Sequence, residues 1–161
     1  MVVQIRVPKI STQEKSVIDY SRLKNDHSKI RVVESFDHPC EVNKARAMKQ
    51  DNKIIASLAN SGDVLVFTLG HAQPSFELKG LEGEGFGLSW NPLQKGVLVG
   101  ATGTSVCLWA VDSSKPSSPQ AKIEKAHESV INDAKFSNLD PNMFGTASDD
   151  HHYKLWDMRA P

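Results

Sequence analysis

The sequence predicts an all-β fold built from repeated units of four short strands, and three observations support this prediction. Apolar and polar residues alternate in short runs, which is the period of a half-buried strand. Turn-forming Gly, Asn, Asp and Pro residues separate these runs, and the sequence shows no helical periodicity. Phe67, Trp109 and Trp156 recur at intervals of 42 and 47 residues. Four short strands in a period of about 40–45 residues are typical of a β-propeller.

Composition and charge limit the classes of function that we expect. The chain has 161 residues, of which 39% are hydrophobic and 24% charged, as in soluble globular domains. Its 19 basic and 19 acidic residues balance, so we expect no direct binding to nucleic acid and no attachment to a membrane. Two cysteines, Cys40 and Cys107, are too few for a disulfide scaffold or a four-cysteine zinc site. No cofactor is expected, and the lack of a long apolar run or secretory signal favours the cytosol or nucleus.

The first 37 residues form a segment that leads into the first repeat. Residues 2–7 and 29–36 are rich in β-branched side chains and predict two strands, the first of which ends at Pro8. Polar residues dominate 9–28, where a solvated loop is favoured over a helix.

The first repeat, 38–80, is degenerate. It begins at His38 and contains four predicted strands that tight turns separate, which indicates an antiparallel meander. These strands are 42–48, 54–58, 64–67 and 75–79.

The second and third repeats follow the same plan. The second repeat, 81–126, is also degenerate, and a Ser/Pro-rich surface loop at 113–119 precedes its last strand. Its predicted strands are 86–90, 97–99, 106–109 and 121–124. The third repeat, 127–161, is truncated, and it has the most complete pattern, from His127 to the Trp-Asp dipeptide at 156–157.

A buried polar network is predicted in the third repeat. In a propeller blade an Asp accepts a hydrogen bond from the His, which contacts a Ser or Thr hydroxyl that in turn meets the Trp indole N–H. We assign this structural role to His127, Ser148 (with Thr146 as the alternative), Asp150 and Trp156.

The other two repeats lack parts of this network. The first retains His38 but has Ser61 and Phe67 at the Asp and Trp positions. The second retains Trp109 but has Leu81 and Gly103 in place of the His and the Asp. We therefore expect packing alone to stabilise these two blades.

No motif in the sequence indicates catalysis, and we expect no catalytic residue and no metal site. The run Asp149-Asp150-His151-His152 contains metal-binding residue types, but neighbouring residues of a strand point to opposite faces and cannot all converge. The glycine-rich segment 83–87 lacks the further glycine and the lysine of a kinase loop, and no nucleophile elbow is present.

Glu41 and Glu84 each precede the first strand of a repeat, so both should lie on the same rim of the propeller. Two interpretations remain open. The rim is either a solvated surface or a small acidic pocket for a basic peptide.

Three segments, 41–46, 63–67 and 84–92, closely resemble the retinoblastoma-associated histone-binding WD-repeat family. That family includes the small subunit of chromatin assembly factor 1 and subunit 2 of the type B histone acetyltransferase. The resemblance spans about residues 29–160. It implies a seven-bladed fold and a non-catalytic scaffold or chaperone subunit of chromatin assembly or modifying complexes. It further implies a nuclear location, with a cytoplasmic pool also compatible.

The resemblance also implies partners and binding residues. The histone H3 tail would bind on the rim at Glu41, Asn43, Arg46, Glu84 and Phe86. Asn132 falls where the family has a third acidic residue. The histone H4 site is not carried over, because the N-terminal helix and the late-blade loop that form it have no counterpart here.

About three of the seven blades are predicted, which leaves an incomplete ring with exposed strand edges. The alternative function is a WD-repeat protein-interaction scaffold fragment without histone binding.

Overall fold

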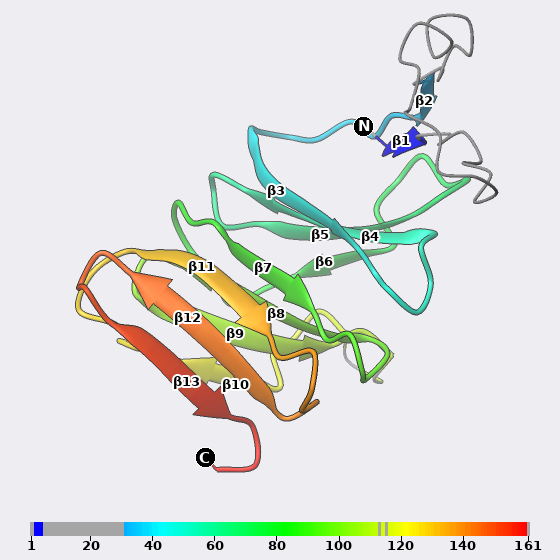
Figure 1. Cartoon of the computed structure of the whole chain (residues 1–161). Helices are drawn as coiled ribbons and strands as arrows, with labels where there is room; N and C mark the ends of the chain where they lie inside the picture. Colours follow the sequence, from blue (N-terminus) through cyan, green and yellow to red (C-terminus); the bar gives the residue numbers. More distant parts are fainter. Residues whose placement is uncertain (1, 5–30, 113, 115, 161) are drawn as a thin grey trace, which may run out of the picture. The chain divides into compact units, whose positions relative to one another are not determined.

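The computed structural model describes residues 2–4, 31–112, 114 and 116–160, and its regular elements are all β-strands (Figure 1). The chain divides into two compact units, Met1–Phe36 and Asp37–Pro161, each considered by itself. In the first unit, β1 (Val2–Gln4) pairs antiparallel with β2 (Arg31–Glu34). These strands confirm the first half of the strand predicted at 2–7 and the central part of the strand predicted at 29–36. The loop predicted at 9–28 lies outside the described residues.

The described part of the second unit forms three antiparallel sheets, each of which is a meander in chain order. This arrangement confirms the all-β prediction. The first sheet contains β3 (Val42–Ala47), β4 (Ile54–Ala59), β5 (Val64–Thr68) and β6 (Phe76–Leu78). The second contains β7 (Gly87–Trp90), β8 (Val97–Thr102), β9 (Ser105–Ala110) and β10 (Ala121–Ile123). The third contains β11 (Ile131–Phe136), β12 (Met143–Ser148) and β13 (Tyr153–Asp157).

The first strands of the three sheets lie next to one another. Strand β7 contacts both β3 and β11, and the three strands run in the same direction (Figure 1). We call β3, β7 and β11 the inner strands. Residues at equivalent positions in the three inner strands therefore lie side by side.

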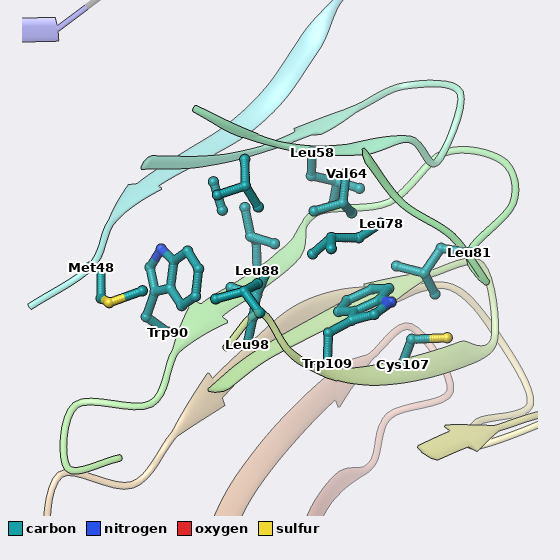
Figure 2. Close-up of a cluster of buried hydrophobic side chains, with 13 residues drawn as sticks. Met48, Leu58, Val64, Leu78, Leu81, Leu88, Trp90, Leu98, Cys107 and Trp109 are labelled. Carbon is teal, nitrogen blue, oxygen red and sulfur yellow. The ribbon is translucent and has the colours of Figure 1, made fainter. Parts of the chain in front are cut away.

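Two hydrophobic clusters hold the sheets together. The first joins the first and second sheets and includes Leu58, Leu78, Trp90 and Trp109, among other buried side chains (Figure 2). The second joins the second and third sheets around Phe144, whose ring contacts those of Phe136 and Trp156. Because each cluster takes side chains from two sheets, every sheet depends on a neighbour for its core.

The buried indoles of the first cluster have hydrogen-bond partners. Trp90 Nε1 donates to the Arg46 carbonyl at 2.8 Å, and Trp109 Nε1 donates to the Lys79 carbonyl at 2.9 Å. Both aromatic side chains thus bury a large apolar surface without leaving a polar atom unpaired. Among the described residues no helix is present, so none there is long and apolar enough to span a membrane.

Candidate functional site

The third sheet contains a continuous chain of hydrogen bonds. His127 Nδ1 lies 2.8 Å from Asp150 Oδ2, and His127 Nε2 lies 2.7 Å from Thr146 Oγ1. Trp156 Nε1 donates to the same Thr146 oxygen at 2.8 Å. One arrangement of protons satisfies every group: the histidine donates to Asp150, and the Thr146 hydroxyl donates to the other histidine nitrogen.

The hydroxyl in this network belongs to Thr146, which corrects the assignment of Ser148. The Ser148 hydroxyl instead donates to the Ser129 carbonyl at 3.0 Å and accepts from the Asp150 amide at 3.2 Å. Residues 146 and 148 share a strand face, so alternation alone does not distinguish them. Thr146 lies within β12, whereas Ser148 is its last residue and lies beside the turn.

Asp150 is held in its ionised form. Burial by itself would raise its pKa, but hydrogen bonds from the Glu128 and His152 amides and from His127 outweigh burial. The net effect places the pKa of Asp150 well below its ordinary value. The carboxylate therefore fixes the turn after β12 and orients the histidine at the same time.

The first sheet retains part of the network, contrary to the expectation that it depends on packing alone. His38 Nε2 lies 2.9 Å from Ser57 Oγ, as His127 lies beside Thr146. Ser61 occupies the position of Asp150 and donates to Asp63 Oδ2 at 2.7 Å. His38 Nδ1 is buried and has no partner among the described residues, and burial lowers the pKa of His38.

The second sheet replaces the network by packing, as expected. Gly100 pairs with Leu88 and Cys107, which makes it the counterpart of Thr146 in β12. A side chain at Gly100 would lie 2.8 Å from the Trp109 ring and 3.0 Å from Leu81 Cδ1. The indole and Leu81 thus fill the space that a histidine and a hydroxyl occupy elsewhere.

Glu41 and Glu84 occupy equivalent positions on one rim. The carbonyl of Glu41 accepts from the Asn60 amide at 2.9 Å, and that of Glu84 accepts from the Gly103 amide at 3.0 Å. Both side chains are exposed. The same bond in the third sheet runs from the Asp149 amide to the Val130 carbonyl at 3.0 Å. The third rim position is therefore Val130, which is 40% exposed.

Asn132 is consequently not the structural counterpart of the two rim glutamates. It follows Val130 by two residues, as Asn43 follows Glu41 and Phe86 follows Glu84, and its amide donates to Asp149 Oδ1. A β-bulge between Ile131 and Asp133 shifts the register at this point, and β3 has a bulge between Val42 and Lys44. Such a bulge displaces the simple alternation of side chains.

Asn43 connects the two glutamate-bearing segments. Its Nδ2 donates to the Gly85 carbonyl at 3.1 Å, and Gly85 lies between Glu84 and the 38% exposed Phe86. Gly85 has no space for a side chain, because a Cβ would lie 2.4 Å from Thr102 Cα. The structure therefore brings together four of the five predicted binding residues on one rim.

Arg46 is the residue that the structure separates from the other four. It lines a hollow of about 210 Å³ between the inner strands, together with Ala47, Lys49, Leu88, Ser89, Trp90, Asp133, Ala134 and Lys135. None of the other four predicted residues lines it. The hollow was not anticipated from the sequence, since its residues come from three strands that are far apart along the chain.

The run Asp149–His152 forms the turn between β12 and β13. Asp150 accepts from the His152 amide at 2.9 Å, and His151 adopts a positive φ of 67°. Within the described ranges, no three His, Cys, Asp or Glu side chains are grouped so that they could hold a metal ion.

Curated proteins of three fungi match most of the chain. It is 37% identical over 145 residues to the Histone acetyltransferase type B subunit 2 of Neurospora crassa, covering 83% of this chain and 32% of that protein. The proteins of the same name from Debaryomyces hansenii and Gibberella zeae are 31% and 33% identical, over 83% and 81% of this chain. The chain spans about a third of the length of these relatives. No family model matches it.

A solved structure supports the fold. The β-propeller domain of Cps50 (Swd1) from Myceliophteria thermophila superposes with a TM-score of 0.67 at 19% identity, covering 78% of this chain and 38% of that chain. The predicted fold, a partial β-propeller, is therefore confirmed.

Proposed function

Since this chain is related over most of its length to the type B histone acetyltransferase subunits 2, and so to the histone-binding WD-repeat family, we propose that it is a non-catalytic scaffold that docks a basic histone tail. The docking surface is the rim that carries Glu41 and Glu84. Its partners are the histone H3 tail and other subunits of nuclear chromatin complexes, with a cytoplasmic pool compatible. Histone H4 is not proposed as a partner.

The equivalent placement of Glu41 and Glu84 is the observation on which this proposal rests. Two exposed carboxylates on neighbouring blades attract the Lys and Arg side chains of a basic peptide. Phe86 and Val130, both partly exposed on the same rim, supply apolar contact area beside the charges. The Asn43–Gly85 hydrogen bond keeps the segments in register, which lowers the entropy cost of binding.

Titration of a fluorescent H3 N-terminal peptide, followed by anisotropy, tests the proposal. An exposed ion pair contributes about 0.2–1 kcal/mol, so Glu41→Gln and Glu84→Gln should each weaken binding by about twofold to fivefold. Glu124 directly follows β10, the outer strand of the second sheet. Glu124→Gln is therefore the matched control and should leave binding unchanged. If neither rim substitution changes the affinity for the H3 peptide, the proposed site is wrong.

A WD-repeat scaffold without histone contact is the second candidate, and Val130 favours it. An apolar residue stands where a third acid would complete the rim. The variant Val130→Glu separates the two candidates. Under the histone proposal it should tighten H3 peptide binding by about twofold to fivefold, because it adds one exposed carboxylate. Under the second candidate, neither the original chain nor this variant binds the peptide.

A further inference from the structure

The N-terminal and C-terminal ends of the inner strands carry opposite charges. The inner strands run in the same direction, so Glu41 and Glu84, which precede β3 and β7, mark one end (Figure 1). Arg46 and Lys49 lie near the end of β3 or beyond it, and Lys135 lies near the end of β11. These three cations line the hollow of about 210 Å³.

The positive charge of the hollow is not neutralised by the described residues around it. Asp133 is the one carboxylate among the lining residues, and it already pairs with Lys44, which is mostly buried. The Arg46 guanidinium donates to the neighbouring Ala45 carbonyl at 2.9 Å, and this bond leaves its charge uncompensated. Arg46, Lys49 and Lys135 thus line the hollow, and none of them forms an ion pair within the described part of the chain.

The walls of the hollow are held in place by the sheets. Arg46, Ser89 and Lys135 occupy equivalent positions, because the residue before each pairs with Ser57, Gly100 and Thr146 respectively. Ser89 Oγ accepts from the Phe136 amide at 3.2 Å, and Trp90 Nε1 donates to the Arg46 carbonyl at 2.8 Å. These two hydrogen bonds link β7 to β3 and to β11, so the backbone that carries Arg46 and Lys135 is held in place before a ligand arrives, which favours binding.

We propose that this hollow binds the carboxylates of an acidic peptide segment of a partner protein. A hollow of about 210 Å³ has room for one or two carboxylate groups. A nucleic-acid backbone needs an extended basic surface, and the zero net charge of this chain offers no long-range attraction to a polyanion. The site goes beyond the proposed function, since it lies at the opposite end of the strands and selects the opposite charge.

A fluorescein-labelled hexaglutamate peptide, titrated at low salt into the full chain, is the probe. We expect saturable binding that Arg46→Gln and Lys135→Gln each weaken by about twofold to fivefold, with a larger loss in the double variant. Lys122→Gln, which removes a cation of the outer strand β10, is the matched control and should have no effect. Because the substituted side chains are exposed, the variants should retain the unfolding midpoint of the original chain.

Three results would overturn the proposal: no saturable binding, an equal loss in Lys122→Gln, or a decathymidylate oligonucleotide that binds more tightly than hexaglutamate and depends on the same two residues. The test is independent of the rim. Glu41→Gln should affect only the H3 peptide, and Lys135→Gln only hexaglutamate, so the failure of one proposal is distinguishable from the failure of the other.

Discussion

At the scale of single residues, Thr146 is the centre of the polar network in the third sheet. Its hydroxyl meets both His127 and Trp156, and both it and His127 are buried. Two polar groups therefore depend on one oxygen atom. Ser148, two residues further along β12, contacts only backbone groups and is less buried.

We predict that Thr146→Val destabilises the chain more than Ser148→Ala does. Valine has the shape of threonine but leaves the histidine and the indole unpaired, at a cost of about 1–3 kcal/mol for each group. Ser148→Ala removes a half-buried hydroxyl and should cost about 1 kcal/mol. Urea unfolding, followed by tryptophan fluorescence, measures both. Equal losses would show that Ser148 shares the central role.

Asp150 leads us to expect a specific pH dependence. Its pKa in the folded chain is lower than the ordinary value of 3.8, so its stabilising contribution is complete above the pKa of the unfolded chain. That contribution is lost as the pH falls from about 4 toward the folded pKa. The stability difference between the original chain and Asp150→Asn should therefore be constant from about pH 7 to 5 and shrink below about pH 4.

Urea midpoints measured across this pH range check the expectation. Glu128→Gln removes an exposed carboxylate of the same sheet and serves as the control, whose curve should follow that of the original chain. A difference for Asp150→Asn that persists unchanged at pH 3 would contradict the stabilising role of the ionised carboxylate.

At the scale of elements, the three sheets have different residues, with different contacts, at one equivalent position of their second strands. Thr146 in β12 completes a four-membered network, Ser57 in β4 retains the contact with His38, and Gly100 in β8 makes room for Trp109. The second strands occupy the same place in each sheet, but the side chains that pack at this position differ. Substitutions at this position should therefore have different consequences in each sheet.

The variant Gly100→Ala should destabilise the second sheet. Its new methyl group would lie 2.8 Å from the rigid Trp109 ring, and overpacking of this kind costs about 1–3 kcal/mol. Gly103→Ala is the control, because its new methyl group would meet no atom within 4 Å beyond the adjacent residues. Only the φ of 51° at Gly103 is unfavourable for alanine, at a cost of about 1 kcal/mol. Urea unfolding of both variants compares the two costs. A Gly100→Ala chain as stable as the original would mean that the indole can move.

At the scale of the whole molecule, the described sheets end in outer strands of different length. Strands β6 and β10 have three residues each, whereas β13 has five and exposes Tyr153 and Leu155 by 69% and 60%. No described strand pairs with the outer side of β13. A long, apolar edge strand is a template for pairing with another chain, whereas short edges are protected.

We predict that this chain self-associates through β13 and that Leu155→Lys reduces the association. A lysine on an edge strand disfavours edge-to-edge pairing because it brings like charges together. Leu139→Lys places the same substitution in the turn before β12, where the leucine is 94% exposed, and should change nothing. Sedimentation velocity over a range of concentrations measures the effect. Identical association of both variants would place the contact elsewhere.

The local structure of the chain could be predicted from its sequence. Alternation and turn residues predicted the strands around Val64–Thr68 and Ser105–Ala110, because the two-residue period and the turn chemistry are properties of short segments. The spacing of Phe67, Trp109 and Trp156 predicted the repeated sheets, and Glu41 and Glu84 were correctly expected on the same rim.

Which of several candidate side chains contact one another could not be predicted and follows from the folded structure. Two hydroxyls share one face of β12, and packing against His127 and Trp156 selects Thr146. The hydrogen bond from the Asp149 amide makes Val130, and not Asn132, the counterpart of the rim glutamates. Arg46 joins Lys135 in one hollow although the two are far apart in the chain. Each of these outcomes depends on contacts between segments that are separate along the chain, and such contacts have no period that can be recognised along a single strand.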